Sequence, residues 1–128
     1  MSRIVISPEN VHKPTTYYSH AVHLDNIVYT AGQAPHVYNG DVWPKSDPEG
    51  QVKCTFENMK LVLDASQSKF SDIVRLNVLL RNSNMIPHFW KVAKDYLGEN
   101  YPSVTVAVVR GLAGPDYLLE FDAIICKS

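Results

Sequence analysis

The chain has little of several features that define common classes of protein. It has only two cysteines, Cys54 and Cys126, without the spacing of a zinc or redox motif, so we expect two reduced thiols. No apolar run approaches the roughly 20 residues that cross a bilayer, and the first residues lack the apolar core of a secretion signal. We therefore expect a cytoplasmic protein with no membrane partner.

Clustered charge is also missing. Twelve Lys and Arg residues against 13 Asp and Glu residues give a formal net charge of −1, and they form no run of like sign. Surfaces that bind nucleic acid need clustered positive charge, so we expect no nucleic-acid partner. His20 and His23 would point to opposite faces of an expected strand and could not bind one ion. We therefore expect no metal site.

The sequence does contain the pattern of one mixed domain. With 128 residues and 45% hydrophobic side chains, residues 1–128 are expected to form a single domain. Apolar runs predict strands, and apolar spacings of three and four predict helices. The predicted strands are 3–7, a hairpin within 18–31 that turns at Asp25 and Asn26, 71–82, 104–110 and 117–126. The predicted helices are 51–66 and 86–97, and the segment 34–50 is predicted as a long loop.

These elements predict an α+β fold, with a roughly six-stranded sheet and two helices on one of its faces. The strand 104–110 is apolar on both sides, with Val104, Val106 and Val108 on one face and Thr105, Ala107 and Val109 on the other. A strand that is apolar on both sides is usually buried on both sides. We therefore expect an oligomer in which the uncovered sheet faces meet.

Three segments resemble the RidA/YjgF family: NIVYTAGQAP (26–35), FENMKLVLDASQSKFSDIVRLNVLL (56–80) and YPSVTVAVVRGLAGPDYLLEFDAI (101–124). The resemblance implies a chorismate-mutase-like domain with a mixed sheet, assembled as a homotrimer with ligand clefts between subunits. It also implies hydrolysis of a small enamine or imine, without a metal or organic cofactor.

The resemblance assigns four residues to the pocket. Glu120 matches the glutamate that handles the water, and it is the expected catalytic residue. Tyr18 and Gly32 match the substrate-binding tyrosine and glycine, while Ala31 stands where many members have a serine. The alternative for Glu120 is an exposed strand surface that it shares with Asp122, because the two side chains alternate to the same face.

The rest of the expected cleft departs from the family pattern. Val104 stands where the family arginine grips a substrate carboxylate, so the chain resembles an arginine-lacking branch. Trp90 stands near a family asparagine, and with Val104 and Val106 it predicts a more apolar substrate-binding cleft; helix packing is the alternative for Trp90. Arg81 and Arg110 are candidate replacement cations, although Arg110 would lie about 20 Å along the strand from Val104.

Two functions follow from these expectations. One is a hydrolase of C–N bonds that deaminates an enamine or imine, for example a larger aminomuconate-type substrate. The other is a homologue without catalysis that binds a small metabolite. Ribonuclease activity, a name attached to some family members, is disfavoured by the even charge, and a steep salt dependence of RNA binding would revive it.

Overall fold

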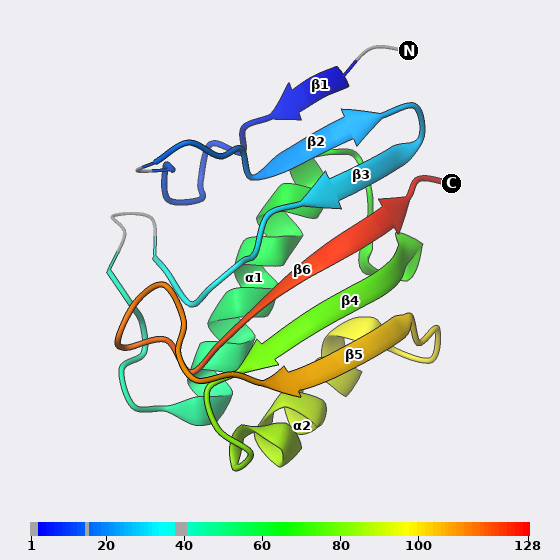
Figure 1. Ribbon diagram of the computed structural model, residues 1–128. Helices are drawn as coiled ribbons and strands as arrows, with labels where there is room; N and C mark the ends of the chain where they lie inside the picture. Colours follow the sequence, from blue (N-terminus) through cyan, green and yellow to red (C-terminus); the bar gives the residue numbers. More distant parts are fainter. Residues whose placement is uncertain (1–2, 15, 38–40) are drawn as a thin grey trace.

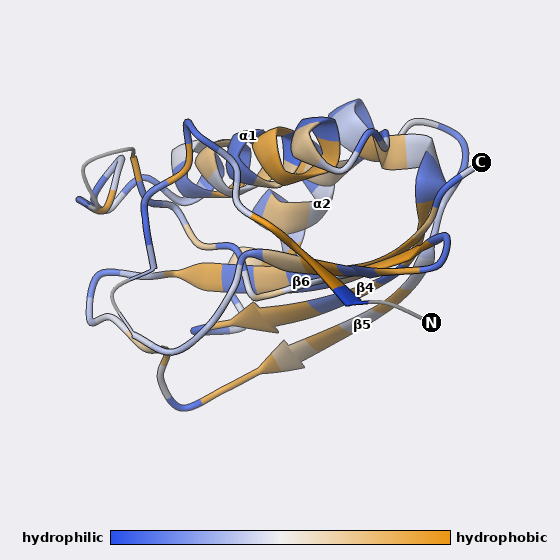
Figure 2. Ribbon diagram, turned by 90° about the horizontal axis from the view of Figure 1, so that it is seen from above, coloured by the Kyte–Doolittle hydropathy of each residue, from blue (hydrophilic) through white to orange (hydrophobic). Residues whose placement is uncertain are grey.

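The computed structural model describes residues 3–14, 16–37 and 41–128. One six-stranded sheet carries both long helices on one face and leaves the other face uncovered (Figure 1 and Figure 2). The elements in chain order are β1 (Arg3–Ile6), β2 (Ala21–Leu24), β3 (Ile27–Thr30), α1 (Pro48–Ala65), η1 (Phe70–Asp72), β4 (Ile73–Leu80), α2 (Met85–Leu97), β5 (Ser103–Val108) and β6 (Leu119–Cys126). The α+β class and the order of elements predicted from the sequence are confirmed.

The strand order in the sheet is β1-β2-β3-β6-β4-β5. The last strand of the chain, β6, lies between β3 and β4 and is antiparallel to both. β5 runs parallel to β4 because α2 carries the chain back between them. The sheet is therefore mixed, and the strand that carries Glu120 is in its interior rather than at an edge.

The first helix begins earlier than the sequence pattern predicted. α1 starts at Pro48 rather than at Gln51, because the Asp47 carboxylate accepts a hydrogen bond of 3.0 Å from the N–H of Gly50 and caps the helix. Proline is suited to the first helical turn, where its missing N–H removes no hydrogen bond. The end of the predicted loop is therefore a helix start. The other boundaries differ from the prediction by one or two residues.

The core lies between the sheet and the helices. The fully buried ring of Phe56 on α1 stacks on Tyr96 of α2, with 4.7 Å between ring centroids. It also lies 6.0 Å from Phe89 of α2 and 4.6 Å from Phe121 of β6. This group of rings joins both helices to the central strand and so fixes the strand on which Glu120 lies.

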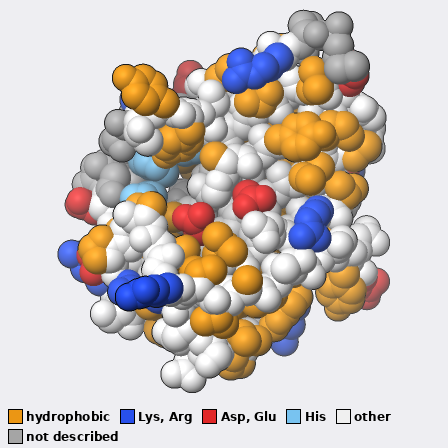
Figure 3. All heavy atoms as spheres, in the orientation of Figure 1, with side chains coloured by type: hydrophobic (Ala, Val, Ile, Leu, Met, Phe, Trp, Pro, Cys, Tyr) orange, Lys and Arg blue, Asp and Glu red, His pale blue; other side chains and the backbone are white. Residues whose placement is uncertain are grey.

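The uncovered face of the sheet is partly apolar. Burial alternates along β6, so that Glu120 and Asp122 point away from the helices. Apolar side chains gather on this face over β2, β3 and the end of β6 (Figure 3), where Tyr29 is 48% exposed. It is the face expected to meet another subunit, and the homotrimer stays a prediction. No helix among the described residues is long and apolar enough to span a bilayer.

Candidate functional site

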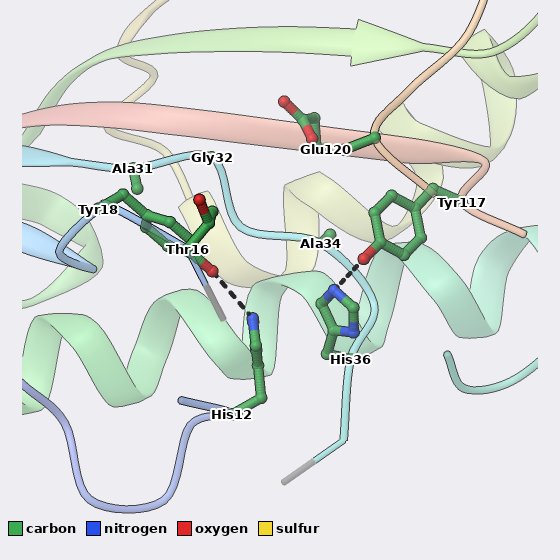
Figure 4. Close-up of a pocket in the computed structure, with 10 residues that line it drawn as sticks. His12, Thr16, Tyr18, Ala31, Gly32, Ala34, His36, Tyr117 and Glu120 are labelled. Carbon is green, nitrogen blue, oxygen red and sulfur yellow. Dashed lines mark hydrogen bonds between the residues drawn. The ribbon is translucent and has the colours of Figure 1, made fainter. Parts of the chain in front are cut away.

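A cavity of about 310 Å³ opens beside the start of β6. Its walls come from the segment after β1, the segment after β3 and the loop before β6 (Figure 4). Four residues predicted from the sequence lie together here: Tyr18, Ala31, Gly32 and Glu120. The lining is completed by His12, Thr16, Ala34, His36, Ala113 and Tyr117.

Backbone pairing brings Gly32 against Glu120. Gln33 and Phe121 exchange two backbone hydrogen bonds of 2.8 and 3.1 Å, and so they align the residues beside them. A Cβ atom at Gly32 would lie 2.9 Å from Oε1 of Glu120, closer than real Cβ atoms come to a neighbour. The glycine therefore leaves the space that the carboxyl group occupies.

A buried hydrogen-bond chain joins the segments after β1 and β3. Nε2 of His20 donates to the carbonyl oxygen of His12 at 2.6 Å, and Nδ1 of His20 lies 3.2 Å from Nε2 of Gln33. The carbonyl oxygen can only accept, so Nε2 of His20 carries the proton of this hydrogen bond. Its role here is structural. Among the described residues, no group of three or more His, Cys, Asp or Glu could hold a metal ion.

Two tyrosine–histidine pairs flank the cavity (Figure 4). Nε2 of His12 lies 3.3 Å from the hydroxyl of Tyr18. Nε2 of His36 and the hydroxyl of Tyr117 form a second, shorter hydrogen bond. The two imidazole rings are neighbours, with 4.1 Å between their centroids. The cavity therefore has aromatic rings and hydroxyl groups on two sides.

Burial and neighbouring charge shift the pKa values of three of these rings. Burial, followed by the positive charge of His36, lowers the pKa of His12 from 6.5 to about 4, so His12 is neutral near pH 7. Burial, followed by the charge of Glu120, raises the pKa of Tyr18. Burial and the neighbouring charges of Tyr18 and Glu120 also raise the pKa of Tyr117. Both phenols therefore keep their protons and can donate them in hydrogen bonds.

Glu120 is a half-buried carboxyl group. Burial raises its pKa, and the charge of Asp122 on the same face raises it further. Asp122 itself accepts a hydrogen bond of 3.2 Å from Asn77. None of the ion pairs in the described part of the chain includes Glu120. A carboxyl group with a raised pKa is suited to accept and return a proton near neutral pH.

The remaining predicted residues lie elsewhere in the single chain. Val104 and Val106 pack against the core, on the helix side of β5, whereas Glu120 is on the uncovered side of the sheet. Arg81 donates to the carbonyl oxygen of Pro115, and Arg110 is exposed. A second cavity, of about 440 Å³, is lined by Trp90, Lys94, Leu97, Tyr101, Pro102 and Val104. One chain does not bring Trp90 or Val104 next to Glu120.

Sequence reasoning missed His12, His36 and Tyr117. All three lie in segments outside the helices and strands, where no apolar periodicity predicts which way a side chain points. Their contacts join positions far apart in the chain, such as His36 and Tyr117. The one local signal was compositional: histidine and tyrosine are frequent between residues 12 and 36.

Comparisons with known proteins place the chain in a family. The family model described as Endoribonuclease L-PSP matches residues 9–127. The chain is 32% identical, over the full length of both proteins, to a RutC family protein of Pyrococcus abyssi. It is 30% identical to the 3-aminoacrylate deaminase RutC of Acinetobacter baylyi, covering 97% of this chain and 98% of the relative. The crystal structure of E. coli TdcF with bound serine has a TM-score of 0.90 and 26% identity, covering 98% of this chain and 99% of that one.

The chain therefore belongs to the Endoribonuclease L-PSP family, which is the RidA/YjgF family that its sequence resembles. The family recognised from the sequence is confirmed, and its arginine-lacking branch stays a prediction. Named relatives include deaminases of imines and enamines, so the family supports a general function in the deamination of reactive nitrogen compounds.

The lowered pKa of His12 predicts a pH-dependent stability. The unfolded chain binds a proton at His12 below pH 6.5, and the folded chain does so only near pH 4. The contribution of His12 to the free energy of unfolding should therefore be fully present above pH 6.5 and be lost as the pH falls from 6.5 toward 4. We expect His12→Asn to flatten this slope in urea titrations. Thr16→Ala, another change in the cavity wall, should keep the wild-type slope; equal slopes in wild type and His12→Asn would contradict the prediction.

Proposed function

We propose that the protein is a hydrolytic deaminase of an imine or enamine, and that Glu120 is its acid–base residue. The observation that carries this proposal is the half-buried carboxyl group of Glu120, which lines a cavity of about 310 Å³ and has a raised pKa. The relative from Acinetobacter baylyi, named as a 3-aminoacrylate deaminase, supports the reaction type.

The proposed reaction needs one residue that moves protons in both directions. The Glu120 carboxylate takes a proton from water as the oxygen attacks the carbon of the protonated imine, and this gives a neutral carbinolamine. The carboxyl group then returns the proton to nitrogen. As the C–N bond breaks, the Glu120 carboxylate takes the proton of the carbinolamine hydroxyl, and ammonia and a carbonyl compound leave. An enamine first takes a proton on carbon to become the imine. The phenol of Tyr18, which keeps its proton, orients the substrate as a hydrogen-bond donor.

Gly32→Ala tests the position of the carboxyl group. The added Cβ would press on the flexible end of the Glu120 side chain, and displacing a reacting group by about 1 Å can lower the rate about 100-fold. We expect turnover of an accepted imine to fall by about this factor, with little change in Tm because the carboxyl group can move aside. Gly111→Ala is the matched control, since a Cβ there meets nothing within 4 Å. Equal turnover in Gly32→Ala and wild type would contradict the proposed position.

We further propose that the protein works as a homotrimer. In this assembly the second cavity, with Trp90 and Val104, faces the Glu120 cavity of a neighbouring subunit. The partly apolar uncovered face, where Tyr29 is 48% exposed, supports burial against another chain. Sedimentation equilibrium tests the assembly, because a mass near that of one chain, 14.4 kDa, would contradict it.

A second candidate is a binding protein without catalysis. No Lys or Arg is among the described residues that line the Glu120 cavity of one chain, and this favours the binding protein, because α-imino acids carry a carboxylate that these residues do not pair. The deciding experiment follows the loss of imines and enamines generated in situ, with and without carboxylates, in the presence of wild type. Acceleration of any of them supports the deaminase. No acceleration, together with saturable binding of a ligand, supports the binding protein.

A further inference from the structure

The backbone around Tyr117 is tied to the first helix, although Tyr117 itself lies in the loop before β6. The fully buried side chain of Gln51 on α1 makes both connections. Its amide nitrogen donates to the carbonyl oxygen of Asp116 at 3.0 Å, and its amide oxygen accepts from the N–H of Leu118 at 2.9 Å. The two peptide groups that flank Tyr117 are therefore both held by one buried residue.

The ring of Tyr117 packs directly on Gly114. The N–H of Tyr117 donates to the carbonyl oxygen of Gly114 at 3.3 Å, which closes a turn between them. A Cβ atom at Gly114 would lie 2.8 Å from Cζ and 3.0 Å from Cε1 of the ring. Only a residue without a Cβ atom leaves room for this contact, so the loop sequence fits the position of the ring.

The hydroxyl end of the same ring is held by His36 (Figure 4). The two rings are nearly perpendicular, with 4.8 Å between their centroids. The backbone of His36 is in turn tied to α1, because Nδ2 of the buried Asn58 donates to its carbonyl oxygen at 2.7 Å. The same nitrogen donates to the carbonyl oxygen of Ala34 at 2.8 Å. Tyr117 is thus fixed at its backbone, along its ring and at its hydroxyl group.

This fixed ring borders the cavity that contains Glu120. An exposed tyrosine in a loop can usually turn aside for a ligand, whereas a side chain that is locked by packing and by supporting hydrogen bonds keeps its place. All the contacts that fix Tyr117 are made within one chain. Its position therefore does not depend on the residues that a neighbouring subunit would add to the cleft.

We propose that Tyr117 is a specificity-determining residue, whose fixed ring forms a rigid wall and limits the size of the group that an imine carries on its C=N carbon. This inference rests on the proposed deaminase function, because it places that carbon beside Glu120. Imines with compact substituents are the substrate class that such a wall favours. A bulky substituent directed at the ring would be rejected, since the ring cannot move to admit it.

Neutral amides test the wall without any turnover. Benzamide, 1-naphthamide and 2-naphthamide share a carboxamide that resembles the C=N group in shape, and the second ring of the two naphthamides projects in different directions. We expect calorimetric titration at pH 7 to show that Tyr117→Ala lowers the ratio of the Kd of the tighter naphthamide to the Kd of benzamide at least about tenfold relative to wild type. One methylene that a pocket admits or rejects already changes discrimination by about 10–200-fold.

Three further variants separate the ring from other effects. Tyr117→Phe keeps the ring and should leave the ratio within about threefold of wild type. Tyr117→Leu is shorter but still covers Gly114, and it should shift the ratio at least about threefold in the direction of Tyr117→Ala. Asp116→Ala is the matched control in the same turn, because the exposed Asp116 side chain lies 4.0 Å from Lys45 and outside the described lining of the cavity. It should keep the wild-type ratio.

Circular dichroism shows which variants are folded, and Tyr117→Leu carries the test if Tyr117→Ala is not. An unchanged ratio in the folded Ala and Leu variants, an equal shift in Tyr117→Phe, or no saturable binding of any probe to folded wild type would each overturn the proposal. If the ratio shifts as expected and no imine is hydrolysed, the deaminase proposal fails and the wall stands. If imines are hydrolysed and Tyr117→Ala keeps the wild-type size preference, the wall fails and the deaminase stands.

Discussion

Glu120→Gln is expected to lower the rate of imine hydrolysis by about 10² to 10⁴-fold, the usual contribution of a positioned acid–base group. Glutamine keeps the size and polarity of the side chain but cannot take a proton from water. The loss should appear mainly in kcat, because the amide still fills the space beside Gly32. Loss of imine absorbance under single-turnover conditions, measured for wild type and variant, gives the rate of the chemical step.

Asp122→Asn is the matched control for this result. Asp122 shares the face of Glu120 and raises its pKa, so the variant should retain turnover with its pH profile moved to lower pH. A Glu120→Gln variant that is folded and keeps more than about a tenth of wild-type turnover would show that another group moves the proton.

Phe56→Ala is expected to lower the free energy of unfolding by about 3–5 kcal/mol, the usual range for removing a buried phenylalanine. The ring is fully buried and contacts Tyr96, Phe89 and Phe121, so its loss leaves a cavity between both helices and β6. The remaining rings cannot all move to fill it, because Phe89 and Tyr96 are held on α2 and Phe121 is held on β6. Urea denaturation at one fixed protein concentration measures the change, since association also affects stability.

Lys53→Ala, on the exposed side of the same helix, is the control for Phe56→Ala. It should change the free energy of unfolding by less than about 0.5 kcal/mol. A loss of less than about 1 kcal/mol for Phe56→Ala would mean that the core collapses around the missing ring, and that the ring cluster does not fix β6 as described.

The periodic parts of the sequence predicted the fold well. The buried positions of α1, from Val52 through Phe56 to Leu63, repeat at helical spacing and face the sheet as expected. Strand alternation alone placed Glu120 and Asp122 on the same face. The start of α1 was wrong, because proline and glycine are typical of both loops and the first turn of a helix.

The site was less accessible to sequence reasoning. Gly32 meets Glu120 only because Gln33 pairs with Phe121, a contact between distant segments that the family resemblance supplied and local pattern did not. Val104 lies opposite the buried Leu76 in the parallel pair of β4 and β5, and so it faces the helices in its own chain. That orientation depends on the order of strands in the sheet, which no short segment determines.

The reciprocal hydrogen bonds between Gln33 and Phe121 also make the two walls of the cavity differ in how easily they open and in how much sequence change they tolerate. The ring of Phe121 packs on Phe56. We therefore expect the wall with Gly32 and Glu120 to open only with the core, and its amide protons to exchange with solvent as slowly as those of the central strands. On heating, the activity that depends on Glu120 should therefore be lost in the same transition in which the protein unfolds. The segment after β1, which supplies His12 and Tyr18, is held instead by the hydrogen bonds of His20 and by the buried Val11. Its exposed residues Thr16 to Tyr18 are therefore where evolution can vary ligand preference at least risk to folding.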